Sequence, residues 1–323
     1  MKKLLKYYLV FVTLFSGVWE AKAQQDAHFT QYMFNNQYFN PAFAGTQEYI
    51  TGMLFYRRQW VGMPGAPISQ NFTGILPFKR KHFAVALNLV NDQIGEVRTG
   101  ALNINAAFSY YINLKNGRLS FGLGLGLQQY RVETANIRAE NTSDLAFSGT
   151  SAAPPIQPDF NFGIFYKTQR YYVGISSTHL NNPGRRITTY KAENPANTAR
   201  HYYLTGGYTF EVDEKFKVTP SFIGRYSESK EFTQNFSTDF SVKTDYIDMV
   251  WLGTSYRTTG VLAFFTGLNI GKIQPDKFKE NIRIGYAYDV SVSATPSYNT
   301  GSHEIFISYM YAPKVKRMMP KFK

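Results

Sequence analysis

The sequence predicts an all-β protein, a transmembrane antiparallel up-and-down β-barrel of about 14 strands. Three observations predict it. The 323 residues are rich in Tyr, Phe and Gly, and aromatic residues, which favour strands, reach 17%. Mean hydropathy is nevertheless slightly polar, at -0.30. Apolar and polar residues alternate with period two along many short segments, as expected of strands with one apolar and one polar face.

The first 23 residues have the pattern of a secretory signal peptide. Three lysines precede the apolar run 7–18, and the motif Ala21-Lys22-Ala23 follows it. The apolar run is shorter than a spanning helix needs. We therefore expect residues 1–23 to be removed between Ala23 and Gln24; the alternative is an N-terminal anchor.

Residues 24–45 form a segment that is too polar to span a bilayer but carries six aromatic side chains. The Asn40-Pro41 pair in this segment favours a turn over a helix. A place against the barrel lumen or the periplasmic rim would bury the aromatic rings. Two roles remain open for the segment, a packing plug and a docking epitope for a periplasmic partner.

The clearest strand is residues 118–132, in which large apolar side chains alternate with glycine and small polar residues. Such a strand would place its large residues against lipid and its small residues in a crowded lumen. A soluble β-sandwich is the alternative, but its outer faces would carry more charge. The expected strands are residues 48–60, 68–76, 82–90, 97–112, 118–132, 159–168, 171–181, 200–211, 216–226, 234–243, 249–257, 261–272, 281–290 and 303–311.

Connection lengths support a barrel (residues 46–311) whose termini are both periplasmic. The two longest connections, 133–158 and 182–199, fall on the same side, which is expected to be the outer side. Arg185 and Arg186 in the second loop are candidate contacts for an acidic partner. Residues 312–323 form a basic periplasmic tail.

The sequence gives no indication of catalytic chemistry. The chain has no cysteine, and its five histidines lack metal-ligand spacing. Ser302, His303 and Glu304 are adjacent on a strand, so they cannot share one face as a hydrolase triad. We therefore expect no enzyme activity, cofactor or metal.

The net charge of +13 is scattered, which argues against nucleic-acid binding. Charges inside the barrel are expected to pair with one another. Asp239 and Asp289 should form ion pairs across the lumen; the candidate partners are Arg225, Lys243, Arg257 and Arg283.

Three motifs resemble the PorP/SprF family of type IX secretion proteins from Bacteroidetes. The opening motif includes Gln31-Tyr32-Met33 and Asn40-Pro41, and it closes on Gly45. The ending motif includes Tyr288-Asp289 and Gly301-Ser302-His303-Glu304, and an internal element begins at Trp251. The resemblance marks these residues as possible partner contacts.

The resemblance implies an outer-membrane barrel of the type IX secretion and gliding machinery of a Gram-negative bacterium. Its members support export or surface attachment of adhesins with a C-terminal sorting domain, or link to periplasmic machinery. Partners would then be proteins of that system and outer-membrane lipid. The alternative function is a transport channel for small solutes.

Overall fold

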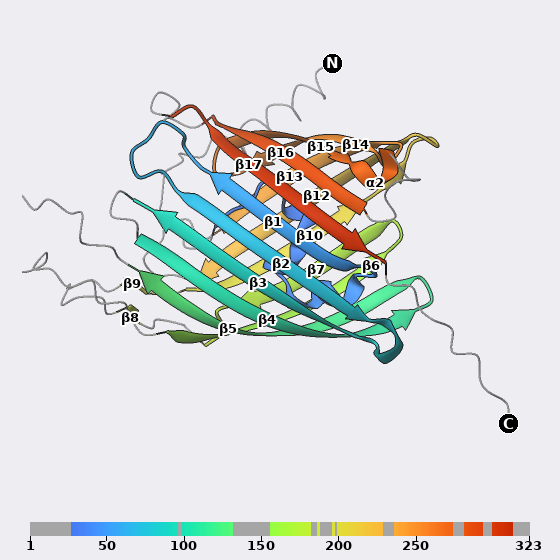
Figure 1. Cartoon of the computed structure of the whole chain (residues 1–323), viewed down its shortest axis with the longest axis horizontal. Coiled ribbons are helices and arrows are strands. Elements are labelled where there is room, and N and C mark those ends of the chain that lie inside the picture. Colours follow the sequence, from blue (N-terminus) through green and yellow to red (C-terminus); the bar gives the residue numbers. More distant parts are fainter. Residues whose placement is uncertain are drawn as a thin grey trace, which may run out of the picture.

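The computed structural model describes residues 27–95, 99–131, 156–181, 186–187, 196–197, 199–228, 236–273, 281–292 and 299–312. In this part of the chain, consecutive antiparallel strands form one closed 14-strand β-barrel (Figure 1). The ring closes where β1 pairs with β17, and it is continuous on the far side through the β10–β12 pairing. No helix in the described ranges is long and apolar enough to cross a membrane.

The strands of the barrel follow one another around the ring in chain order. They are β1 (Ile50–Arg58), β2 (Ile68–Phe78), β3 (Phe83–Ile94), β4 (Thr99–Leu114), β5 (Gly117–Arg131), β6 (Gln157–Thr168), β7 (Tyr171–Thr178), β10 (Arg200–Tyr208), β11 (Phe210–Glu211), β12 (Phe216–Glu228), β13 (Phe236–Tyr246), β14 (Val250–Arg257), β15 (Val261–Asn269), β16 (Asn281–Ser291) and β17 (Ser302–Tyr311). The two-residue β11 continues the line of β10, so the two together fill one place in the ring.

The sequence located all the barrel strands but misplaced several of their ends. The strand expected at 200–211 is interrupted at Thr209, whose amide donates to the carbonyl of Arg170 instead. The strand expected at 261–272 ends at Asn269, and the chain continues as the short helix α2 (Ile270–Ile273). A small hairpin of β8 (Arg186–Ile187) and β9 (Ala196–Asn197) lies in the region expected to be a plain loop.

The outer surface of the barrel is the apolar one. On β5 the side chains of Leu123, Leu125 and Leu127 are 59%, 62% and 51% exposed, while Gly122 and Gly124 face inward and are buried. Leucines that remain exposed along a single face of a pleated strand suit contact with lipid tails. The face assignment made from the alternation is therefore correct.

The two ends of the barrel differ. The turn between β4 and β5 lies at one end, here called the turn end, together with the start of β1 and the end of β17. The last residues of β5 and β7 lie at the opposite end, here called the loop end.

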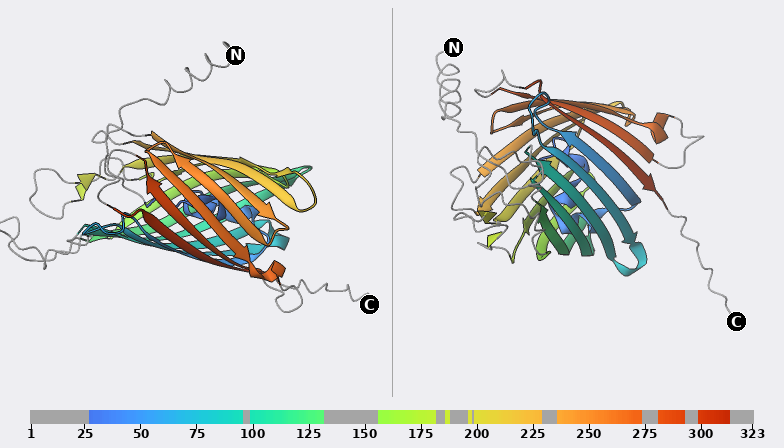
Figure 2. Two further views of the ribbon diagram at one scale, coloured as in Figure 1. Left: turned by 90° about the horizontal axis from the view of Figure 1, so that it is seen from above. Right: turned by 60° about the vertical axis from the view of Figure 1, so that its left-hand side comes forward.

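The lumen contains residues 27–46, here called the plug, which comprises three short 3-10 helices (Figure 2). These are η1 (Tyr32–Phe34), η2 (Asn36–Tyr38) and η3 (Pro41–Thr46). The start of the plug contacts strand residues near the loop end, and Gly45 contacts β5 near the turn end. The plug therefore runs through the lumen along the barrel axis and leaves it where β1 begins.

Candidate functional site

The start of the plug is bound by a buried cluster of charged residues near the loop end. Glu304 accepts hydrogen bonds from the backbone amides of Thr30 and Gln31, at 2.7 and 2.9 Å. The hydroxyl of Thr30 lies 2.8 Å from both carboxylate oxygens of Asp289. Arg57 on β1 joins the two acids, 2.6 Å from Asp289 and 3.2 Å from Glu304. The opening and ending motifs of the sequence thus meet inside the lumen.

A second buried cluster lies next to the first. Asp239 on β13 pairs with Arg225 on β12 at 2.8 Å and with Arg257 on β14 at 3.0 Å. Asp289 and Glu304 also act electrostatically on Arg257, so the clusters form one network. It holds three arginines and three carboxylates, and this balance of charge is what allows six ions to be buried together.

The expected ion pairs were correct for Asp239 with Arg225 and Arg257, but they join neighbouring strands and do not cross the lumen. The expected partners of Asp289 were wrong, because its cation is Arg57. Lys243 instead bonds to Asp245 on its own strand. Arg283 has no ion-pair partner within the described ranges. Arg57 could have been found from its inward position in the alternation of β1, but its partner depends on the barrel closing between β1 and β17.

Polar side chains also anchor the middle of the plug. The amide of Asn35 donates to Asn71 at 2.7 Å and to Thr73 at 3.0 Å, both on β2. Asn88 on β3 donates to the carbonyl of Gln37 at 2.8 Å. On the opposite wall the hydroxyls of Tyr32 and Ser221 lie 3.2 Å apart. The plug is therefore held on several sides of the lumen.

The Asn40-Pro41 turn is a further anchor. The side-chain oxygen of Asn40 accepts from the amide of Ala42 and caps η3, and its amide nitrogen donates to the carbonyls of Ile164 and Ile175 at 3.0 and 3.1 Å. The hydroxyl of Ser109 donates to the carbonyl of Pro41 at 2.6 Å. The side chain of Asn40 thus forms hydrogen bonds both with the first turn of η3 and with two strand carbonyls.

Small residues on the wall leave room for this turn. A Cβ atom at Gly122 would lie 2.2 Å from the amide nitrogen of Ala42, and one at Gly163 would lie 2.1 Å from the side-chain oxygen of Asn40. A Cβ atom at Gly45 in the plug itself would lie 2.1 Å from the hydroxyl oxygen of Ser120. Close approach of the plug and the wall therefore explains the glycines at these three positions.

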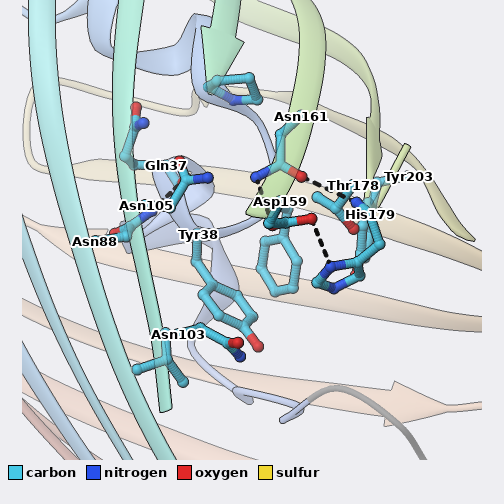
Figure 3. Close-up of a pocket in the computed structure, with 13 residues that line it drawn as sticks. Gln37, Tyr38, Asn88, Asn103, Asn105, Asp159, Asn161, Thr178, His179 and Tyr203 are labelled. Atoms are coloured by element: carbon cyan, nitrogen blue, oxygen red, sulfur yellow. Dashed lines mark hydrogen bonds and ion pairs between the residues drawn. The ribbon is translucent and has the colours of Figure 1, made fainter. Parts of the chain in front are cut away.

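A small polar cavity lies between the plug and the wall toward the loop end (Figure 3). Its volume is about 50 Å³, and asparagine side chains of β3, β4 and β6 line it. Asp159 accepts from Asn161 and lies 3.0 Å from Nδ1 of His179, as Figure 3 shows. The cavity has room for a few water molecules but not for a substrate, so we assign it to packing of the plug.

The other residues singled out in the sequence lie in different places. Trp251 is buried in the lumen, with its ring 5.0 Å from that of Phe34 in the plug. Tyr288 and His303 point outward and their rings are 5.2 Å apart. Gly301 has a φ of +96°, and its carbonyl accepts from the amide of Val61.

Met33 is partly buried against both apolar clusters of the lumen. Arg186 begins the β8–β9 hairpin. Ala23, Gln24 and Arg185 lie outside the described residues. Over the ranges that the structure describes, no three His, Cys, Asp or Glu side chains are grouped as a metal site.

Solved structures that resemble the chain are barrels of low sequence identity. CymD, a monoaromatic hydrocarbon channel, is 12% identical with a TM-score of 0.49, over 88% of this chain and 93% of that chain. The toluene transporter TodX of Pseudomonas putida is 11% identical with a TM-score of 0.47, over 91% and 96%. The outer membrane protein Omp33 of Acinetobacter baumannii is 7% identical with a TM-score of 0.43, over 82% and 99%. No curated protein matches the chain.

A family model described as type IX secretion system membrane protein PorP/SprF matches residues 21–309. This range includes the plug and nearly all of the barrel, and it confirms the resemblance of the opening and ending motifs. The chain therefore belongs to the PorP/SprF family, as an outer-membrane β-barrel of the type IX secretion system.

Proposed function

We propose that the protein is a plugged scaffold in the outer membrane that holds a secreted adhesin at the cell surface. The observation that carries the proposal is the plug, which runs along the lumen and is hydrogen-bonded to the wall from β17 to β6. A lumen that is occupied in this way favours a protein-binding role over passage of solutes. Partners within the type IX system follow from the family, and the adhesin is the finer proposal.

The proposed topology places the loop end outside the cell. Residues 1–23 would direct export and be removed before Gln24. The first and last residues of the barrel would face the periplasm, and the basic residues 312–323 would lie there as a tail. Long outer loops on a rigid barrel are suited to binding. Arg185 and Arg186 would attract an acidic surface of the adhesin, and the interaction would weaken as salt increases.

The first prediction tests this partner surface. Replacing Arg185 and Arg186 together by Ser should release the adhesin from cells into the medium, because the steering charge is lost while the barrel still inserts. The measurement is the division of adhesin between cells and medium at equal barrel abundance. Lys115 and Arg170, two exposed cations of the turn end, provide the matched control when both are changed to Ser.

Only the pair of substitutions in the loop is expected to lower retention of the adhesin. Release by the loop pair, with retention in the control, supports the proposal. Retention in both variants contradicts a role for the loop arginines. Release by the control pair alone would move the partner surface to the periplasmic turn end, where the tail and the end of the plug are the next candidates.

A further inference from the structure

A second cavity lies in the lumen at the turn end, on the other side of the plug from the polar cavity of Figure 3. Its volume is about 380 Å³, within the range of sites that bind small organic molecules. Residues of the plug form one wall, and residues of β1, β6, β7, β12, β13, β16 and β17 form the others. The scaffold role proposed above does not use this cavity.

One part of the cavity wall is apolar and adaptable. The plug contributes Met33, Phe34 and Phe43, and the strands contribute Met53, Phe165 and Met310. Methionine side chains are flexible and polarisable, and together with aromatic rings they accommodate apolar groups of varied shape. This surface suits the body of an organic molecule better than an inorganic ion.

The other part of the wall is positively charged. Lys167, Lys243 and Arg283 face the cavity, and Asp245 is the one carboxylate among its lining residues. Lys243 is bonded to Asp245 and lies 5.7 Å from the centre of the Phe34 ring. Neither Lys167 nor Arg283 forms an ion pair in the described part of the chain. The positive charge of Arg283 acts unfavourably on that of Lys167, whereas the carboxylate of Glu48 acts favourably on it.

Two positive charges that face one cavity attract an anion into it, because apolar walls concentrate the electric field of these charges. They stand in contrast to the network near the loop end, where every arginine is matched by a carboxylate. The described wall of the turn-end cavity therefore carries more cations than carboxylates, and a bound anion would offset part of this excess.

We propose that this cavity binds an organic anion, with its carboxylate between Lys167 and Arg283 and its apolar body against the methionine and phenylalanine side chains. The opening to the turn end is shared with a wider cleft around the β4–β5 and β6–β7 turns, since Gln47 and Lys167 line both. A ligand would therefore enter from the periplasm in the topology proposed above.

Calorimetric titration of the mature protein in lipid nanodiscs tests the proposal, with naphthalene-2-carboxylate as the probe. Naphthalene-2-methanol has the same apolar body without the charge, and empty nanodiscs measure partition into lipid. We expect saturable binding of the carboxylate at one site, at least about tenfold tighter than the alcohol, because charge-assisted hydrogen bonds are stronger than neutral ones.

Variants distinguish specific contacts of Lys167 and Arg283 with the carboxylate from nonspecific attraction by other cations of the turn end. Lys167→Gln and Arg283→Gln should each weaken carboxylate binding about tenfold and leave binding of the alcohol unchanged. Arg283→Lys, which keeps the charge, should retain most of the affinity. Lys115→Gln removes a cation from the neighbouring turn, outside this cavity, and serves as the matched control. Far-ultraviolet circular dichroism verifies that each variant is folded.

Three results would overturn the proposal. They are equal affinity for the acid and the alcohol, an equal loss in Lys115→Gln and Lys167→Gln, or no saturable binding of the carboxylate up to its solubility. If Arg283→Gln does not fold, Lys167→Gln compared with Lys115→Gln decides the question alone. Because adhesin retention is not measured, the result is independent of the scaffold proposal.

Discussion

At the scale of single residues, the fit between plug and wall depends on positions where no side chain can be accommodated. Gly122 faces the backbone of Ala42, whereas a Cβ atom at Gly124, two residues further along the same face of β5, would first meet the side chain of Asn105 at 2.9 Å. Backbone cannot move aside as the end of a side chain can. Two chemically identical positions on one strand should therefore respond differently to the same substitution.

The second prediction compares Gly122→Ser with Gly124→Ser. The first should lower the free energy of unfolding by about 1–3 kcal/mol, since the Asn40-Pro41 turn must be displaced. The second should cost less, because the new side chain would meet side-chain atoms of Asn105 and Asn161, at 2.9 and 3.0 Å, and no backbone atom of the plug. Urea titration of the two folded proteins in detergent gives the comparison, and equal losses would mean that the plug does not pack on β5.

The stability of the folded protein depends on pH through His28, at the start of the plug. Burial lowers the pKa of His28 well below its ordinary value of 6.5, and the nearby charges of Arg225 and Arg257 lower it further. Asp239 acts in the opposite sense but more weakly. The side chain is therefore neutral in the folded protein, and its Nδ1 is buried without a hydrogen-bond partner.

The third prediction follows from the sign of this shift. Above about pH 6.5 His28 is neutral whether the protein is folded or unfolded, so its contribution does not change. As the pH falls below that value the unfolded chain binds a proton that the folded chain resists, and stability declines. The melting temperature should fall more between pH 7.5 and 5.5 in the wild type than in His28→Gln; parallel slopes would contradict the assignment.

At the scale of elements, the alternation of residue types was enough to locate the strands and assign their faces. Period two fixes the side on which each residue lies, so Leu123 could be placed toward lipid and Glu304 opposite to His303. The path of the plug could not be predicted in this way, because its 3-10 turns impose no regular spacing on apolar residues.

Contacts between elements were harder to predict from the sequence than the elements themselves. Asp239 and Arg257 face each other directly on adjacent strands, a pair that follows once the register is known. Arg57 reaches Asp289 and Glu304 only because β1 closes the ring against β17, some 250 positions later in the chain. Gly122 of β5 could be recognised as inward-facing, but its close neighbour in the plug, Ala42, could not.

The fourth prediction tests the lipid-facing element. Leu123→Arg, near the middle of β5, should lower the free energy of unfolding by about 2–4 kcal/mol in a bilayer, because it places a charge at mid-depth. Leu119→Arg lies on the same face near the turn end and should cost about 0–1 kcal/mol. Equilibrium unfolding from lipid vesicles provides both values. Equal costs would contradict the placement of Leu123 deeper in the bilayer than Leu119.

At the scale of the whole molecule, the barrel and its plug are one structure, because the ion network joins the first described residues of the chain to its last strand. Thr30 and Gln31 are bound by Glu304, and the plug continues directly into β1. The charge that the lumen buries near the loop end is balanced between three arginines and three carboxylates. Such a barrel is suited to remain closed while its ends bind other proteins.

The central claim, that the plug closes the lumen, is tested most directly by conductance across a planar bilayer. The wild type should show no steady open pore. A variant with Asp289→Asn and Glu304→Gln should open, because it weakens the contacts that hold Thr30 and Gln31 and leaves Arg57 without its counter-charges. A wild-type protein that conducts steadily, at the same level as this variant, would contradict the closed scaffold and favour a channel for small solutes.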